Sequence, residues 1–211
     1  MHQPTAFAQS ESQALRELAS EFPLATLIAT FSGVPIINHV PMLWNGSELH
    51  GHIAKANELK KALENSATAV IATAVFHGPE GYISPADYPS KALHGKVVPT
   101  WNYAVAHITG TLQLRPDPQF IRQQIDQLTE AHEARANPDQ PWSLDDAPPE
   151  FAQALSSSIV GIALQIETIE GKYKLSQNRG TPDRRGAAEG ALARGNTALA
   201  ELMQTNELPR S

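Results

Sequence analysis

The sequence contains no cysteine among its 211 residues. Disulfide bonds, thiol catalysis, cysteine-ligated zinc and iron–sulfur clusters are therefore excluded. No apolar run approaches the roughly 20 residues that a membrane-spanning helix needs. The N-terminal residues lack the basic and apolar regions of a secretory signal. We therefore expect a cytoplasmic protein without a membrane partner.

Positive charge is also scarce. Sixteen lysines and arginines stand against 22 aspartates and glutamates, a formal net charge of −6. Affinity for duplex DNA comes mainly from lysines and arginines that neutralise phosphates. The sequence also has no convincing helix-turn-helix pattern. DNA as a partner would have to rest on a local basic patch.

Common catalytic motifs are missing as well. The chain has no P-loop, no Gly-x-Gly-x-x-Gly stretch and no Gly-x-Ser-x-Gly elbow. The sequence therefore assigns no catalytic residues, and it leaves open whether the protein is an enzyme. Any hydride or electron chemistry would belong to a bound cofactor.

Hydrophobic residues make up 41% of the chain, enough for a sizeable core. Six segments have the apolar or alternating pattern of strands, and helical patterns lie between and after them. The expected strands are 22–30, 34–44, 47–54, 68–77, 101–115 and 159–169, and the expected helices are 11–20, 57–64, 120–132 and one or two from residue 182 onward. This order favours a closed or nearly closed antiparallel barrel with peripheral helices.

Turn residues divide these elements. Asn45-Gly46 predicts a hairpin with a type I′ turn, because both central residues of that turn need positive φ. Stretches 78–90 and 137–150 are rich in breakers and predict loops. We expect one domain over residues 1–180 and a helical extension over 181–211.

A cluster of hydrogen-bond donors follows the last expected strand. Its members are Lys172, Lys174, Ser176, Gln177, Asn178 and Arg179. Such donors at a strand end suit a phosphate or the edge of a flavin. Lys172 and Lys174 share a strand face, so both can meet one anion while Tyr173 packs behind. The alternative is a solvated strand end followed by a turn.

A second candidate group is His52, Lys55 and Asn57, at the end of a strand and the start of a helix. Lys55 and the helix N-terminal amides can hold a phosphate through charge and backbone donors. The alternative is that Asn57 caps the helix and Lys55 is solvent-exposed.

A third group is Trp101, Asn102 and Tyr103. Trp101 and Tyr103 share one strand face, and Asn102 faces the other way. The aromatic pair can stack on a planar ligand or fill the barrel or a dimer interface. Tyr82 and Ser84, in the expected loop, are placed to close over a ligand.

Three histidines belong to one expected hairpin. His50 and His52 share a strand face, and the turn is expected to bring His39 within range of them. A metal or haem site is one interpretation, and hydrogen-bonding histidines at a barrel mouth or dimer interface is the other. Because no carboxylate accompanies them at ligand spacing, we expect no metal site.

Several segments together resemble one family. In chain order they are Asn38-His-Val-Pro-Met-Leu43, Leu49-His-Gly-His-Ile-Ala-Lys-Ala-Asn57, Gly78-Pro-Glu-Gly-Tyr-Ile-Ser-Pro85, Val98-Pro-Thr-Trp-Asn-Tyr103 and Ile169-Glu-Gly-Lys-Tyr-Lys-Leu-Ser-Gln-Asn-Arg179. The chain is similar to the PaiB-type family of FMN-binding negative transcriptional regulators. Lys55 departs from the family, which usually has an arginine there, and this loses bidentate geometry while keeping the charge.

The resemblance implies an antiparallel Greek-key split β-barrel of the pyridoxamine-phosphate-oxidase type, mainly β with peripheral helices. It implies a homodimer that binds FMN at the subunit interface, and it assigns the second and third groups and the donor cluster to the cofactor. A regulatory role would act through a small-molecule ligand or a partner. The alternatives are a flavin-dependent oxidoreductase acting on a small molecule and a haem-binding or haem-degrading barrel.

Overall fold

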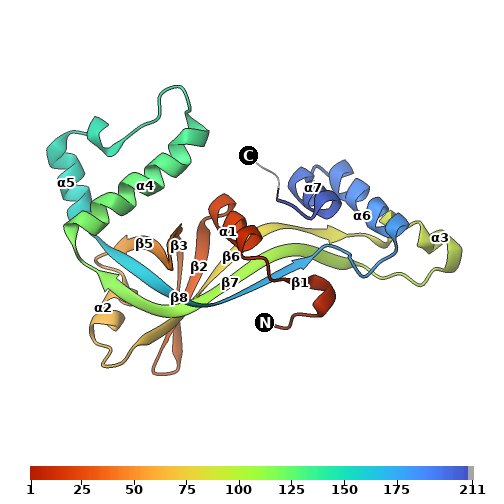
Figure 1. Ribbon diagram of the computed structural model, residues 1–211, viewed down its shortest axis with the longest axis horizontal. Helices are drawn as coiled ribbons and strands as arrows, with labels where there is room; N and C mark the ends of the chain where they lie inside the picture. Colours follow the sequence, from red (N-terminus) through yellow and green to blue (C-terminus); the bar gives the residue numbers. More distant parts are fainter. Residues whose placement is uncertain (209–211) are drawn as a thin grey trace. The chain divides into compact units, whose positions relative to one another are not determined.

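The computed structural model describes residues 1–208, and Figure 1 shows its elements in chain order. The strands are β1 (Ala8–Gln9), β2 (Leu24–Phe31), β3 (Val34–Pro41), β4 (Leu43–Asn45), β5 (Glu48–Ala54), β6 (Val70–Ile83), β7 (Thr100–Arg115) and β8 (Ile159–Lys174). The helices are α1 (Ser12–Glu21), α2 (Glu58–Glu64), α3 (Ser90–His94), α4 (Pro118–Ala136), α5 (Pro149–Ser157), α6 (Thr181–Ala193) and α7 (Thr197–Thr205), with short 3₁₀ turns η1 (Thr5–Phe7), η2 (Pro85–Asp87) and η3 (Leu144–Asp146).

The elements form two compact units, each built from separate pieces of chain. The first unit comprises Met1–Phe22, Phe76–His107 and the chain from Ile169 onward. The second comprises Pro23–Val75 and Ile108–Thr168. The boundary expected at residue 180 stays a prediction. Within the described residues, no helix is both long and apolar enough to cross a membrane.

All eight strands belong to one antiparallel sheet, with the order β3-β2-β6-β7-β8-β5-β4 and β1 paired to β8. In the described chain the end strands β3 and β4 are not paired to each other, so the sheet is not closed. The predicted antiparallel architecture with peripheral helices is confirmed. The long strands β6, β7 and β8 are neighbours in that order (Figure 1), and each has one end in either unit.

The second unit contains the hairpins. Residues of β2 lie opposite residues of β3, with Thr26 across from His39 and Ile28 across from Ile37. Alternate β2 side chains, Ala25, Leu27 and Ala29, are buried, as expected for a strand with one face on the core. One face of β2 therefore packs on the core of this unit, although the apolar run in the sequence does not itself alternate.

The predicted type I′ turn at Asn45-Gly46 is wrong, although the hairpin is present. Asn45 still pairs with Glu48, so the central turn residues are Gly46 and Ser47, of which Gly46 alone has positive φ, at 59°. The β2–β3 turn has this property instead, because Ser32 and Gly33 have φ of 49° and 83°. Turn type follows from strand register, which the dipeptide alone does not determine.

The predicted loop over 78–90 is wrong in its first part, because β6 continues to Ile83. Pairing of β6 with β2 ends at Val75. Pro79, which has no N–H to donate, therefore interrupts no hydrogen bond between β6 and β2. A Cβ added at Gly78 would lie 2.5 Å from Leu18 Cδ1, so the glycine lets α1 pack closely on the strand. Gly78 and Pro79 thus lie in the part of β6 beyond its pairing with β2, where α1 packs on the strand.

Two other boundaries differ from prediction. The last strand continues to Lys174, so Lys172 and Lys174 lie within β8. The predicted loop 137–150 holds η3 and the start of α5, a helix that the sequence analysis did not predict. No α5 side chain is buried, so this helix does not contribute to the core. The helices expected after residue 182 are confirmed as α6 and α7.

Candidate functional site

Lys174, the last residue of β8, is the most distinctive cation of the first unit. Its ammonium donates hydrogen bonds to Thr100 Oγ1 and, at 2.7 Å, to the Trp101 carbonyl. An ammonium has three N–H donors, so one remains for a ligand. In residues 1–208 no carboxylate forms an ion pair with Lys174. Burial lowers the pKa of Lys174, and the nearby cation of Lys172 adds to this, while Tyr103 opposes it.

An exposed aromatic pair lies next to this cation. Trp101, whose carbonyl binds Lys174, is 54% exposed, and Tyr82 of β6 is 48% exposed. Their ring centroids are 6.3 Å apart at an interplanar angle of 71°, an edge-to-face arrangement. The position of Tyr82 within a strand, rather than a loop, fixes it beside Trp101. The pair offers apolar surface to a planar ligand.

Ser176 holds the chain after β8 in an unusual conformation. Its φ is 65°, in the left-handed region that costs a non-glycine residue roughly 1–2 kcal/mol. Its buried hydroxyl accepts a hydrogen bond of 2.9 Å from Asn102 Nδ2. Asn102 is fully buried, and its Oδ1 has no partner among the described residues. Backbone strain at Ser176 and the unpaired Asn102 Oδ1 are both features that cluster at functional sites, so this turn is a candidate functional site.

Lys172 is used by the protein itself. Its ammonium donates to the His2 carbonyl at 3.0 Å and lies 5.5 Å from the centroid of the Tyr103 ring. Tyr173, on the opposite face of β8, is buried and donates to the Ala14 carbonyl of α1 at 3.1 Å. The two lysines share a face as predicted, and each has its own partners there.

The remaining members of the donor cluster differ in availability. The Gln177 side chain folds back on its own turn, accepting from the Leu175 amide at 2.7 Å and donating to the Tyr173 carbonyl at 2.6 Å. The Arg179 guanidinium lies 4.8 Å from the centroid of the buried Tyr88 ring, and Asn178 is exposed. The structure thus brings together Lys172, Lys174, Ser176 and the 101–103 segment, while Gln177 serves its own turn.

His52, Lys55 and Asn57 lie in the second unit. Asn57 caps α2, accepting from the Leu59 amide at 2.9 Å, and its Nδ2 donates to Asn38 Oδ1 at 2.7 Å. The Lys55 side chain is exposed. The capping role is therefore present, and Lys55 stands at the surface as a cation available to an anion.

The three histidines do not form one group. His52 Nδ1 is 2.5 Å from Gln124 Oε1 of α4, and His50 Nε2 is 2.8 Å from Glu48 Oε2. His39 Nδ1 is 3.3 Å from Thr26 Oγ1 on the neighbouring strand. Within the part of the chain that the structure describes, no three His, Asp or Glu side chains come together as a metal would require. Each of the three histidines thus has its own hydrogen-bond partner, and His39 lies on β3, which pairs with β2.

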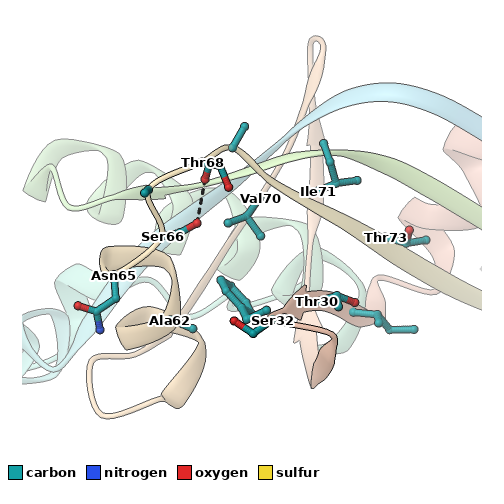
Figure 2. Close-up of a pocket in the computed structure, with 13 residues that line it drawn as sticks. Thr30, Ser32, Ala62, Asn65, Ser66, Thr68, Val70, Ile71 and Thr73 are labelled. Atoms are coloured by element: carbon teal, nitrogen blue, oxygen red, sulfur yellow. Dashed lines mark hydrogen bonds between the residues drawn. The ribbon is translucent and has the colours of Figure 1, made fainter.

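A hollow of about 740 Å³ also lies in the second unit, between the β2–β3 turn, the end of α2 and the start of β6. Figure 2 shows hydroxyl and amide side chains along it. They are Thr30, Ser32, Asn65, Ser66, Thr68 and Thr73. Neither an ionisable side chain nor any of the predicted site residues lines it. It therefore has no cation to bind a phosphate and no group for acid–base chemistry.

Sequence reasoning missed several residues that complete the first unit's site. Thr100 binds the Lys174 ammonium, and Tyr88 lies under the Arg179 guanidinium. Ser90 donates twice to Asp183, which lowers the pKa of that carboxyl. These contacts join segments about 75 to 95 positions apart, as the bonded pairs Lys174–Thr100 and Ser90–Asp183 show. A short motif carries no signal for such pairs.

Comparisons with known proteins agree with the fold and the resemblance. A profile of the family described as “Putative FMN-binding domain” matches residues 1–168, which includes His52, Lys55 and Asn57 and ends before the donor cluster. An uncharacterized protein of Emericella nidulans, AN0679, is 31% identical over 87% of each chain. The Bacillus subtilis “Protease synthase and sporulation protein PAI 2” is 28% identical over 87% of this chain and 85% of its own. The predicted PaiB-type resemblance is confirmed.

Solved structures show the same fold. The FAD and haem binding protein of Mycobacterium smegmatis superposes with a TM-score of 0.59 at 18% identity, over 89% of this chain and 80% of its own. The flavocytochrome Anf3 of Azotobacter vinelandii has a TM-score of 0.57 at 16% identity, over 83% and 71%. At these identities the likeness concerns the fold, and the predicted split-barrel class is confirmed.

Proposed function

The chain belongs to the family described as “Putative FMN-binding domain”, and from this membership we propose that it binds a flavin, with FMN as the cofactor. The observation that carries the proposal is the half-buried Lys174 ammonium beside the exposed Trp101 and Tyr82 rings. A cation with a remaining donor and an apolar aromatic surface are what an anionic, planar cofactor needs. The named relatives of M. smegmatis and A. vinelandii, a FAD-binding protein and a flavocytochrome, support a flavin in general.

The residues present fit such a cofactor in two places. In the first unit, Lys174 and Arg179 supply cations without a carboxylate ion pair in the described chain, and Trp101 supplies a stacking face. In the second unit, Lys55 is an exposed cation close in sequence to the capped start of α2. We propose that Lys174 and Lys55 are the cofactor-binding cations. Lys172 and Gln177 hold the backbone that presents Lys174.

A bound flavin supplies hydride or electron transfer, and the protein supplies binding and orientation. For this chain we propose a regulatory role exerted through a small-molecule ligand or a partner protein. Direct DNA binding has little support, because the formal net charge is −6. A gel shift with its own upstream DNA, persisting at physiological salt, would overturn that part of the proposal.

We also propose that the protein is a homodimer. The support is an apolar sheet face in the second unit, where Leu24 of β2, Ile37 of β3 and Ile71 of β6 are all more than half exposed. The β2–β3 and β2–β6 registers place these side chains on the same face, with Ile28 between them. Exposed apolar patches of this kind mark interfaces. Ile37→Lys should convert the dimer to a monomer in light scattering, and a dimer that survives it would move the interface elsewhere.

The experiment for the cofactor is an absorbance spectrum after incubation with FMN and desalting, repeated with riboflavin, which lacks the phosphate. We expect FMN to be retained and riboflavin to be largely lost. Lys174→Met and Lys55→Met should each weaken FMN binding about tenfold, the scale of one lost charge-assisted hydrogen bond. Lys91→Met, at an exposed lysine of α3, is the matched control and should change nothing.

The outcomes separate the alternatives. Equal retention of FMN and riboflavin would show that no phosphate is bound, and a colourless protein would refute flavin binding. Retained FMN that oxidises NADPH with an added acceptor would assign an oxidoreductase. A Soret band on addition of haem, lost in His52→Ala, would assign a haem protein instead.

A further inference from the structure

The acidic charge of this protein is concentrated in one segment. Residues 116–158, here called the acidic arm, contain eight carboxylates and two arginines, a formal net charge of −6. The full chain has the same net charge of −6, so the rest of the sequence is balanced. The acidic arm comprises α4, η3 and α5, which Figure 1 draws in green and teal.

The acidic arm is held together by its own ion pairs and hydrogen bonds. Arg122 of α4 binds Asp126 at 2.8 Å and also reaches Asp145 of η3 at 2.8 Å. The Trp142 amide donates to Glu133 Oε2 at 2.9 Å, which ties the loop to α4 a second time. These contacts fix η3 and the preceding loop against α4, so the arm presents a defined surface to which another molecule can bind.

One surface of the acidic arm is apolar and uncovered. Phe151 and Leu155 of α5 are 57% and 50% exposed, and four residues apart they lie on one helix face. No α5 side chain is buried within the described residues. Trp142 lines a hollow of about 330 Å³ between α4 and η3 and is also exposed. A helix that presents its apolar face to water marks an interaction site.

Charge indicates what covers this face. A second copy would bring an acidic arm of the same charge, and nucleic acid would bring phosphates, so both would be repelled. A segment with lysines or arginines beside apolar side chains complements the face in both respects. We propose that the acidic arm docks a basic amphipathic segment of another protein, whose apolar side chains cover Phe151 and Leu155 while its cations meet the arm's carboxylates. This proposal stands independently of flavin binding.

The test uses the full chain and a synthetic helical peptide of about 16 residues, with leucines on one face and six lysines on the other. Titration calorimetry should detect micromolar binding that falls at least tenfold when salt rises from about 0.05 to about 0.5 M, because the Debye length shortens about threefold. A peptide with glutamates in place of the lysines should not bind. The double variant Phe151→Ser/Leu155→Ser should weaken binding at least tenfold.

A charge variant and a matched control complete the design. Glu130→Gln/Asp139→Asn/Glu150→Gln removes three charges without touching the Arg122 pairs and should also weaken binding about tenfold. Leu93→Ser, at an 83% exposed leucine of α3 in the first unit, should leave binding unchanged. Undiminished binding to the Phe151/Leu155 variant, binding of the glutamate peptide, or no binding at all would each overturn the proposal. A change of oligomeric state in the Phe151/Leu155 variant would identify a second copy as the occupant.

Discussion

The strand end around Ser176 and the helix start around Asn57 carry similar polar residues and use them differently. At the strand end, Asn102 and Ser176 bond to each other, Lys172 bonds to the His2 carbonyl, and Gln177 bonds within its own turn. At the helix start, Asn57 makes two hydrogen bonds, and the neighbouring Lys55 extends into solvent.

This difference teaches that a dense run of donors in a sequence is not the same as a set of donors available to a ligand. Most of the donor cluster stabilises the end of β8. Lys174, with one remaining N–H donor, and Arg179 are the members available to bind a ligand. The helix start has fewer donors, and its lysine is wholly available. Stability measurements should therefore respond strongly to changes at the strand end and weakly to changes at the helix start.

The largest effect is expected for Asn102→Leu. The substitution leaves the buried Ser176 hydroxyl without its partner, and an unsatisfied buried polar group costs about 2 kcal/mol of unfolding free energy. Urea denaturation measures this loss. Asn178→Ala, at an exposed neighbour, should stay within about 0.5 kcal/mol of wild type. If Asn102→Leu is as stable as wild type, the strand end is not held by this bond.

The next effect concerns the backbone at Ser176. Ser176→Ala and Ser176→Gly both remove the hydroxyl, but only alanine keeps the penalty of a positive φ. We expect the glycine variant to be about 1 kcal/mol more stable than the alanine variant. The same denaturation series provides the comparison. An alanine variant at least as stable as the glycine variant would contradict the left-handed conformation.

At the helix start, Asn57→Ala should lower stability by about 1 kcal/mol, because α2 loses its N-cap. Thermal unfolding followed by circular dichroism measures it. Lys55→Ala should fall within about 0.5 kcal/mol of wild type. If Lys55→Ala lowers the stability as much as Asn57→Ala does, the lysine side chain contacts the protein and is not free in solvent, and the contrast with the strand end would be wrong.

The smallest effect is a pH dependence in the first unit. The hydrogen bond from Arg194, at 2.7 Å, lowers the pKa of Asp87, with a further contribution from the Ser84 amide against the opposing effect of burial. A folded-state pKa below the unfolded value of about 3.9 means that the pair stabilises the fold at neutral pH and ceases to do so as the pH falls through the folded-state pKa.

Arg194 is well exposed, so the pair is worth only about 0.5 kcal/mol. The melting temperature of Arg194→Ala should therefore be slightly below that of wild type at neutral pH. The two melting temperatures should become equal once Asp87 is protonated. A difference in melting temperature that persists in acid would assign the effect to packing of the arginine stem instead of charge.

Much of the fold follows from the sequence, because periodicity reports burial. The near-continuous apolar run of β2 and the helical pattern of α4 predicted both elements. The α5 helix was missed although Phe151 and Leu155 stand at helical spacing, because the Pro- and Asp-rich stretch 137–150 that leads into it favours a loop. The extension of β6 across Gly78 and Pro79 could not be foreseen either, because it depends on α1 packing there and on β2 having ended.

The candidate site was predictable in its members and less so in their roles. The alternation of side chains along strands correctly placed Trp101 and Tyr103 opposite Asn102, and Lys172 with Lys174. The sequence does not reveal that Gln177 bonds its own turn, or that Thr100 holds Lys174. Those assignments need the three-dimensional partner, and the partner of Lys174 lies 74 positions away.

The interleaving of the two units has a consequence for synthesis on the ribosome. The first unit needs the chain's early residues and its late ones together, as the bond between Tyr173 and Ala14 shows across 159 positions. At roughly 5–20 residues per second, α1 waits some ten to thirty seconds before its partner strand emerges. During that interval Leu15 of α1, which packs against Gly171 of β8, has no partner strand to cover it. The first unit therefore cannot complete its packing until β8 has been synthesised.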